Sequence, residues 1–196
     1  DMIVKGVLAA EIPGGKTVRD LVTTDSPVSE VTNSASGVVV VHAKDRETAD
    51  FCISTMAPSR LAKVKNNFGK AYSNALTQIQ DAPAFKLGWQ AKHRFWEEND
   101  QIYGGISWTD HPITQMWYPS DNFFSQSGVL TGAFNNGATA ERFGALSHPE
   151  RVALALEGGE KLHPGFSNWV YRDRALSIAW HNMPHIPGGW QNNPPG

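Results

Sequence analysis

The sequence predicts an α+β fold, with a mixed or antiparallel sheet and helices inserted between its strands. Strand-like segments rich in valine and aromatic residues follow one another in runs, whereas a doubly wound parallel sheet alternates strands with helices. The sequence also contains no G-x-G-x-x-G and no G-x-x-x-x-G-K-[ST] phosphate-binding loop. With 196 residues, 40% of them hydrophobic, the chain has enough apolar material for one core or two lobes.

The first strands form a predicted hairpin. Its arms, Val28–Thr32 and Gly37–Ala43, are rich in valine and flank a polar turn. Ala49–Thr55 predicts a third short strand, in which the neighbours Phe51 and Ile53 predict a buried thiol at Cys52. Because Cys52 is the single cysteine, an internal disulfide and a cysteine-based zinc cluster are excluded.

The rest of the chain predicts short helices and a series of strands. Helices are expected over Pro58–Val64, Lys70–Ile79, Ala138–Phe143 and Pro149–Leu156, and Ser147 with Glu150 predicts a capping box before the last of them. Strands are expected over Phe85–Ala91, Gly105–Thr109, Gln115–Tyr118, Gly128–Phe134 and Ala175–Trp180, with a loop at Arg94-Phe95-Trp96 and a Pro/Gly/Asn-rich tail from Pro184.

Several function classes find no support. The net charge is -2 and the 17 Lys and Arg residues are spread along the chain, so no nucleic-acid partner is expected. The longest aliphatic run, Val38–Val41, is too short to span a bilayer, and no membrane partner is expected. No G-x-S-x-G elbow of a serine hydrolase is present. Pro184 separates His181 from His185, which favours ordinary hydrogen-bonded histidines, His163 included, over a metal site.

Two features from the residues alone are candidate site elements. Trp190 follows Gly188-Gly189, and paired glycines allow a close backbone approach beside a flat side chain that suits a planar cofactor. Lys86 lies between Phe85 and Leu87 on a predicted strand, so it points away from both. Two alternatives stay open for Lys86, a lysine that faces solvent and a lysine that faces a cavity and holds a water. Most of the seven tryptophans are expected in the core or at a lobe interface.

Taken in order, these segments resemble the C-terminal half of flavin-dependent amine and L-amino-acid oxidases, closest to bacterial L-amino-acid oxidases and the related amino-acid monooxygenases. The resemblance runs from about Val28 through these segments: Asp50–Pro58, Phe85-Lys86-Leu87, Arg94-Phe95-Trp96, Gly104–Asp110, Trp117-Tyr118-Pro119, Gly128–Phe134, Trp180 and Gly188-Gly189-Trp190.

The resemblance implies roles for individual residues. Lys86 matches the family lysine that holds a water near the flavin N5 position, and Trp180 matches an aromatic residue near the isoalloxazine. Gly188, Gly189 and Trp190 match the loop along the flavin and substrate pocket. Val28 matches a backbone contact to the adenine. Phe134 stands where many members have a tyrosine that helps to hold the substrate carboxylate, so this contact lacks its hydroxyl donor here.

The resemblance also implies how the chain is organised. Residues 1–57 are expected to form part of the FAD-binding lobe with the hairpin, residues 58–175 the substrate-binding lobe, and residues 176–196 a return to the FAD-binding lobe. The G-x-G-x-x-G segment, which binds the FAD pyrophosphate, and the last flavin segment are expected on other chains of the same enzyme. The chain is therefore expected to be a proteolytically processed subunit or a fragment, active in a hetero-oligomer and unable to bind FAD alone.

The implied activity is that of an FAD-dependent L-amino-acid oxidase, which converts an L-amino acid into an imine and then a 2-oxo acid and ammonia, while O2 gives hydrogen peroxide. Two alternatives lie within the flavoenzymes: a monoamine or polyamine oxidase, and an amino-acid 2-monooxygenase that forms an amide. A further alternative is a non-catalytic aromatic-rich module that binds sugars or peptides. A flavin-bearing complex and its products separate these classes.

Overall fold

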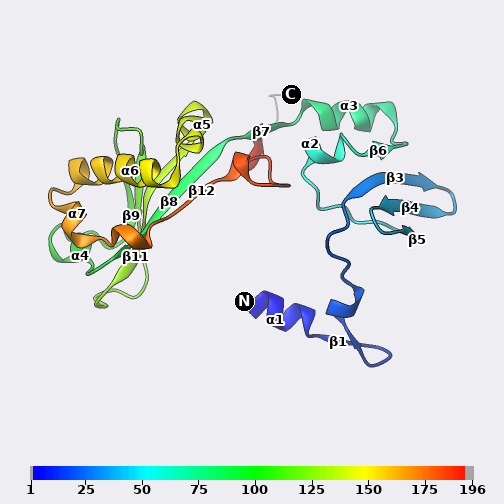
Figure 1. Ribbon diagram of the computed structural model, residues 1–196, viewed down its shortest axis with the longest axis horizontal. Coiled ribbons are helices and arrows are strands. Elements are labelled where there is room, and N and C mark those ends of the chain that lie inside the picture. Colours follow the sequence, from blue (N-terminus) through cyan, green and yellow to red (C-terminus); the bar gives the residue numbers. More distant parts are fainter. Residues whose placement is uncertain (1, 193–196) are drawn as a thin grey trace. The chain divides into compact units, whose positions relative to one another are not determined.

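The computed structural model describes residues 2–192 and divides into two compact units. The first unit comprises the chain up to Thr55 together with Ala62–Ser73, and the second comprises Met56–Leu61 and the chain from Asn74 onward (Figure 1). Residues 193–196 of the predicted tail lie outside the described residues. The lobe boundaries expected after residues 57 and 175 refer to a complete enzyme, and they stay a prediction.

The first unit contains the predicted hairpin. Its four-stranded sheet has the order β5-β4-β3-β6, with β3 at Val28–Ser34, β4 at Gly37–His42, β5 at Arg46–Ala49 and β6 at Lys65–Asn66. Strands β3 and β4 pair antiparallel, with Val31 opposite Val40, which confirms the hairpin. The residues before it form α1 (Met2–Leu8), the short pair β1 (Glu11–Ile12) and β2 (Lys16–Thr17), and the 3-10 helix η1 (Val18–Leu21).

The prediction for Cys52 is wrong, since Cys52 is exposed. The predicted strand over Ala49–Thr55 is also wrong, because β5 ends at Ala49. Arg46–Ala49 pair with Val41–Val38 along the outer edge of β4. Because β4 begins at Gly37, the residues that follow Ala49 run past its end after one position. Phe51 and Ile53 are 88% and 92% exposed in this chain.

The second unit is built on a five-stranded antiparallel sheet in the order β12-β8-β11-β10-β9. Its strands are β8 (Ala84–Ala91), β9 (Gly105–Trp108), β10 (Gln115–Tyr118), β11 (Gly128–Asn136) and β12 (Leu176–Ala179), and a separate pair joins β7 (Gln80–Ala82) to β13 (Trp190–Asn192). Each of the five strands predicted for this region is present. The α+β class with an antiparallel sheet is therefore confirmed.

The helices are α2 (Pro58–Leu61), α3 (Lys70–Gln78), α4 (Phe95–Glu98), α5 (Gly137–Ala145), α6 (His148–Leu162) and α7 (Phe166–Trp169), with 3-10 turns η2 (Arg172–Arg174) and η3 (Trp180–Asn182). The loop predicted at Arg94–Trp96 instead leads into α4. Phe95 and Trp96 are fully buried, and the stacking of Phe95 on Trp169, with ring centroids 4.8 Å apart, stabilises this short helix. No helix within residues 2–192 has the length and apolarity needed to cross a membrane.

The capping box predicted before α6 is present. Both the backbone N–H and the hydroxyl of Ser147 donate to the Glu150 carboxylate, at 2.7 and 2.6 Å. These hydrogen bonds, the side-chain one first, lower the pKa of Glu150. The cap fixes the start of α6, which packs on the sheet.

The two faces of the sheet differ. Phe85, Leu87 and Trp89 of β8 are fully buried in the core that includes residues of α5, α6 and α7, and α5 and α6 lie along one side of the sheet in Figure 1. Because side chains alternate along a strand, Lys86 and Gln90 point to the opposite face. We call this the open face, and it carries Lys86, Gln90, Ile106, Trp108, Trp117, Val129, Phe134 and Leu176.

Candidate active site

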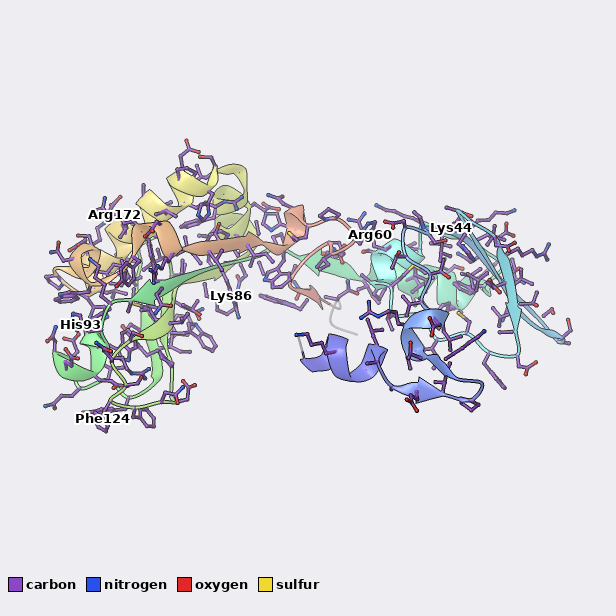
Figure 2. The ribbon with its side chains drawn as sticks, turned by 60° about the horizontal axis from the view of Figure 1, so that its bottom comes forward. Lys44, Arg60, Lys86, His93, Phe124 and Arg172 are labelled. Carbon is purple, nitrogen blue, oxygen red and sulfur yellow. The ribbon has the colours of Figure 1, made fainter. Side chains whose placement is uncertain are left out.

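Lys86 extends from β8 near the start of that strand (Figure 2). Its neighbours across the sheet are Phe134 of β11 and Ile178 of β12. The Lys86 Nζ lies 4.7 Å from the Phe134 ring centroid and 6.0 Å from that of Trp117. An ammonium over an aromatic face is attracted by the ring quadrupole, so the two rings orient the lysine. The predicted direction of Lys86, away from Phe85 and Leu87, is confirmed, and in this chain the side chain is exposed.

Other aromatic residues extend this face beyond what we predicted. The Trp117 indole N–H donates to the Gln115 Oε1 at 2.7 Å, and Gln115 is buried. Trp117 is 40% exposed and Trp108, across from Gln115, is 69% exposed. We expected most tryptophans in a core or interface and did not single out these two. Side chains alternate between the two faces of the sheet along Gln115–Tyr118 and Gly105–Trp108. This alternation places Trp117 and Trp108 on the face away from the buried Met116 and Tyr118, and it is the sequence signal that identifies them.

The C-terminal glycine pair makes the predicted close backbone approach, and its partner is β7. The Gly189 N–H donates to the Ala82 carbonyl at 2.9 Å. A Cβ on Gly188 would lie 2.5 Å from that same carbonyl oxygen, and a Cβ on Gly189 would lie 2.5 Å from the Ala84 Cβ. Glycine is therefore required at both positions. The approach sets Trp190 opposite Ala82 and leaves it 41% exposed.

Trp180 joins this group through β12. Ala179 pairs with Phe85, so Trp180 follows at the level of Ala84, and the Trp180 Cδ1 lies 3.9 Å from the position of a Cβ on Gly189. The structure thus brings Trp180, Gly188, Gly189 and Trp190 together at the start of β8. Lys86 and Phe134 form the adjoining contact pair.

Val28 lies in the other unit. It begins β3 and pairs with His42, and a register shift separates it from Glu30. The Ser26 hydroxyl contacts the His42 Nδ1 beside it. The contact of Val28 with an adenine stays a prediction.

The surroundings of Trp190 fit a planar cofactor. Asp81 accepts a 2.6 Å hydrogen bond from the Gln191 Nε2, while the buried Gln191 Oε1 has no hydrogen-bond partner among the described residues. An unpaired buried acceptor is costly unless a donor reaches it. The exposed indole of Trp190 offers a flat apolar surface to a planar ring, and the Gln191 Oε1, on the other side of β13, is left for a separate donor.

Replacing Gly188 by alanine is expected to displace this loop. The added methyl group meets backbone atoms of Ala82, which have no rotamer to move, so β13 must separate from β7 at a cost of roughly 1–3 kcal/mol. We expect a lower melting temperature and less flavin per polypeptide in the complete enzyme. Gly69→Ala is the matched control, because a Cβ there has nothing within 4 Å. Unchanged flavin content in Gly188→Ala would show that this approach does not shape the site.

The histidines take structural positions. His163 is hydrogen-bonded at both ring nitrogens, to Asp100 at 2.8 Å and to the Tyr118 hydroxyl at 2.6 Å, as predicted for an ordinary histidine. The prediction is wrong for His181, whose buried Nδ1 has no hydrogen-bond partner among the described residues. The Tyr118 hydroxyl that contacts His163 is itself buried, and this burial raises the pKa of Tyr118. Between residues 2 and 192, no three His, Cys, Asp or Glu side chains gather as a metal site.

A buried ion pair at the far end of the sheet was not predicted. Arg94 and Glu97 are 2% and 4% exposed, and the Arg94 Nη2 lies 2.6 Å from the Glu97 Oε1. The hydrogen bond from Arg94 holds the pKa of Glu97 below its usual range. Arg94 also donates to the Asp121 carbonyl, and Glu97 accepts the Phe124 N–H. The i,i+3 spacing is visible in the sequence, but burial of both charges is a tertiary property.

Comparisons with known proteins identify the family to which this chain belongs. The family model described as "Flavin containing amine oxidoreductase" matches residues 8–196. An L-amino-acid oxidase of Protobothrops flavoviridis is 29% identical over 170 residues, which are 83% of this chain and 33% of that protein. An L-amino-acid oxidase of Mus musculus is 25% identical over 178 residues, which are 87% of this chain and 28% of that protein. The chain spans about a third of the length of these relatives.

Solved structures show the same fold at lower identity. Cyclohexylamine oxidase from Brevibacterium oxydans matches with a TM-score of 0.75 at 19% identity, over 91% of this chain and 39% of that one. Putrescine oxidase matches with a TM-score of 0.70 at 20% identity, over 85% of this chain and 36% of that one. The expected fold is therefore confirmed. Since the family model covers nearly the whole sequence, this chain belongs to the flavin-containing amine oxidoreductase family.

Proposed function

We propose that this chain forms one wall of the active site of an FAD-dependent L-amino-acid oxidase. The observation that carries the proposal is the position of Lys86, whose Nζ lies over Phe134 on an exposed aromatic sheet face. The Gly188-Gly189-Trp190 loop adjoins the start of the same strand, β8. Relatives named as L-amino-acid oxidases support this substrate class.

In this proposal, each group of residues has a separate task. Trp180, Gly188, Gly189 and Trp190 hold the flavin, with Val28 contacting the adenine, and Lys86 holds a water beside the ring. FAD, when bound, supplies the two-electron oxidant for the C–H bond next to the amine. The Lys86 ammonium beside Phe134 disfavours a second positive charge nearby, so it keeps the substrate amine neutral with its lone pair available. Amino acid, water and O2 then yield 2-oxo acid, ammonia and hydrogen peroxide.

Segments beyond this chain complete the site in our proposal. The sequence lacks the G-x-G-x-x-G loop that binds the FAD pyrophosphate. We propose that residues outside this sequence provide this loop. Flavin bound by the complex but not by the isolated chain would support this arrangement.

Phe134 favours a second candidate, a monoamine or polyamine oxidase. Phenylalanine has no hydroxyl group to donate to a substrate carboxylate, and its ring faces the Lys86 ammonium. An amine without a carboxylate needs no such donor. An amino-acid 2-monooxygenase, which forms an amide, is a third class that product analysis separates from the oxidases.

Anaerobic bleaching of the flavin absorbance in the complete enzyme tests the proposal. Each L-amino acid is compared with the amine that lacks its carboxyl group, and oxygen is then admitted for product analysis. We expect amino acids to bleach the flavin faster and to yield 2-oxo acid with peroxide. Bleaching by amines alone would replace the proposal with the second candidate, and amide formation would replace it with the monooxygenase.

A further inference from the structure

A cavity of about 520 Å³ lies in the second unit, at the end of the open face opposite to Trp190. Its lining comes from β8, from Arg94 and from the segment that precedes and begins β11. Most lining side chains end in an amide or a hydroxyl group, namely Gln90, Asn122, Ser125, Gln126 and Ser127. The volume falls in the range of sites for small molecules.

The wall of this cavity is preformed. Arg94 donates to the Asp121 carbonyl at 2.9 Å, and Glu97 accepts the Phe124 N–H at 2.8 Å, so the buried ion pair fixes the loop from both sides. A Cβ on Gly128 would lie 2.9 Å from the Arg94 Nη1 and 3.1 Å from the Trp96 ring, so a larger residue there would have to displace these side chains. Little ordering is therefore left to oppose a ligand.

The charges of the lining disfavour an anionic ligand. The Arg94 charge is compensated by Glu97 at 2.6 Å, and the one other charged side chain of the lining is the Asp121 carboxylate. A carboxylate or phosphate would meet Asp121 and no free cation. Amides and hydroxyl groups instead offer donors and acceptors to a group of their own kind.

The cavity shares the open face with Lys86. Gln90 and Lys86 are both even-numbered positions of β8, and Gly88 lies between them without a side chain. Four residues of strand separate them by about 13 Å. Leu176 lies opposite Gly88 on one side and Thr131 on the other. Because Gly88 is the only residue of β8 that faces this side between Lys86 and Gln90, no β8 side chain lies between them on the open face.

We propose that this cavity binds the far end of the substrate, and that this end carries a neutral hydrogen-bonding group, an amide or a hydroxyl. This inference rests on the proposed function, because it takes the reacting amine to lie beside Lys86. It identifies the substrate class as an amine with a long side chain whose terminus is polar and uncharged. Gln90, which lines the cavity and lies on the same face of β8 as Lys86, is then a specificity-determining residue.

The test uses the complete enzyme and a series that begins with Nε-acetyl-L-lysine. Its other members have side chains with the same number of atoms, ending in methyl, hydroxyl, carboxylate or ammonium, and each is also supplied without the α-carboxylate. We expect the kcat/KM for the amide or hydroxyl end to exceed that for the methyl end by about fivefold, the worth of one net hydrogen bond. The larger of the two ratios, amide to methyl or hydroxyl to methyl, identifies the preferred end group. Binding of each compound by calorimetry gives a measure that does not need turnover.

In the Gln90→Leu variant we expect the ratio of kcat/KM for the amide or hydroxyl end to kcat/KM for the methyl end to fall to about one. Damage to the fold would lower the kcat/KM values for the polar and the methyl ends alike and leave their ratio unchanged. Gln78→Leu is the control, since Gln78 is exposed on α3 away from the cavity lining. Equal kcat/KM for all ends, a kcat/KM for the ammonium end above that for the amide and hydroxyl ends, or a ratio that survives in Gln90→Leu overturns the inference. Selective binding of the amide or hydroxyl end without turnover of any member would retain the inference and reject the proposed function.

Discussion

Replacing Lys86 by methionine in the complete flavin-loaded enzyme is expected to slow turnover by well over tenfold, since one preorganised charge beside a reacting centre is worth roughly 10²-fold. Methionine keeps a flexible apolar stem above Phe134 but has no ammonium to hold a water. Because the role inferred for Lys86 concerns oxygen, stopped-flow traces should place the loss in the oxidative half-reaction. Reduction by substrate should change less.

The control for this variant is Lys161→Met. Lys161 lies on α6 in an exposed pair with Glu157 at 3.3 Å, and such pairs contribute little to stability. Turnover of Lys161→Met should match that of the parent enzyme. If both half-reactions of Lys86→Met proceed at near-normal rates, Lys86 does not have the role that the family resemblance implies.

Arg94→Met is expected to lower the free energy of unfolding by about 3–5 kcal/mol, because it leaves a buried carboxylate without its partner. Glu97 is only 4% exposed, so its carboxylate would be poorly solvated without the guanidinium. Urea unfolding of the complete protein measures the loss. Arg94→Met combined with Glu97→Leu should recover part of it, since no buried charge is then left. A loss below about 1 kcal/mol in the single variant would mean that the pair is solvated.

The same pair has a defined pH dependence. Arg94 lowers the pKa of Glu97 in the folded chain, so the contribution to stability is complete above the ordinary glutamate pKa of about 4.3. It is lost as the pH falls from that value through the lowered pKa, where Glu97 becomes protonated also in the folded state. The difference in stability between the parent and Arg94→Met should therefore shrink in acid.

Local sequence patterns were sufficient for much of the fold. The Val28–His42 hairpin, the strands of the second unit and the Ser147 capping box follow from valine content, alternation and cap residues. The errors occur where tertiary contacts decide. Phe51–Ile53 has strand-forming residues, but Arg46–Ala49 already pair with β4. Arg94–Trp96 has no helical period, yet burial of two aromatic rings supports a helical turn.

The candidate site likewise contains residues that the local sequence identifies and residues that depend on tertiary contacts. Lys86 and the Gly188-Gly189 pair carry local signals, since a lysine between apolar neighbours and two adjacent glycines stand out in a single sequence. The residues that surround them in the folded chain come from distant segments of the sequence. Phe134 reaches Lys86 only through the register of β11 on β8, and the Arg94–Glu97 pair encloses a cavity only once the loop before β11 packs on it. Pairing register and burial are not encoded in any one segment.

A crystal structure of the complete protein with its cofactor tests the central claim most directly. We expect FAD within van der Waals contact of Trp190, about 4 Å, with the Lys86 Nζ directed toward the ring across the open face. A Lys86 Nζ in bulk solvent, together with no dinucleotide within reach of Trp190, would contradict it.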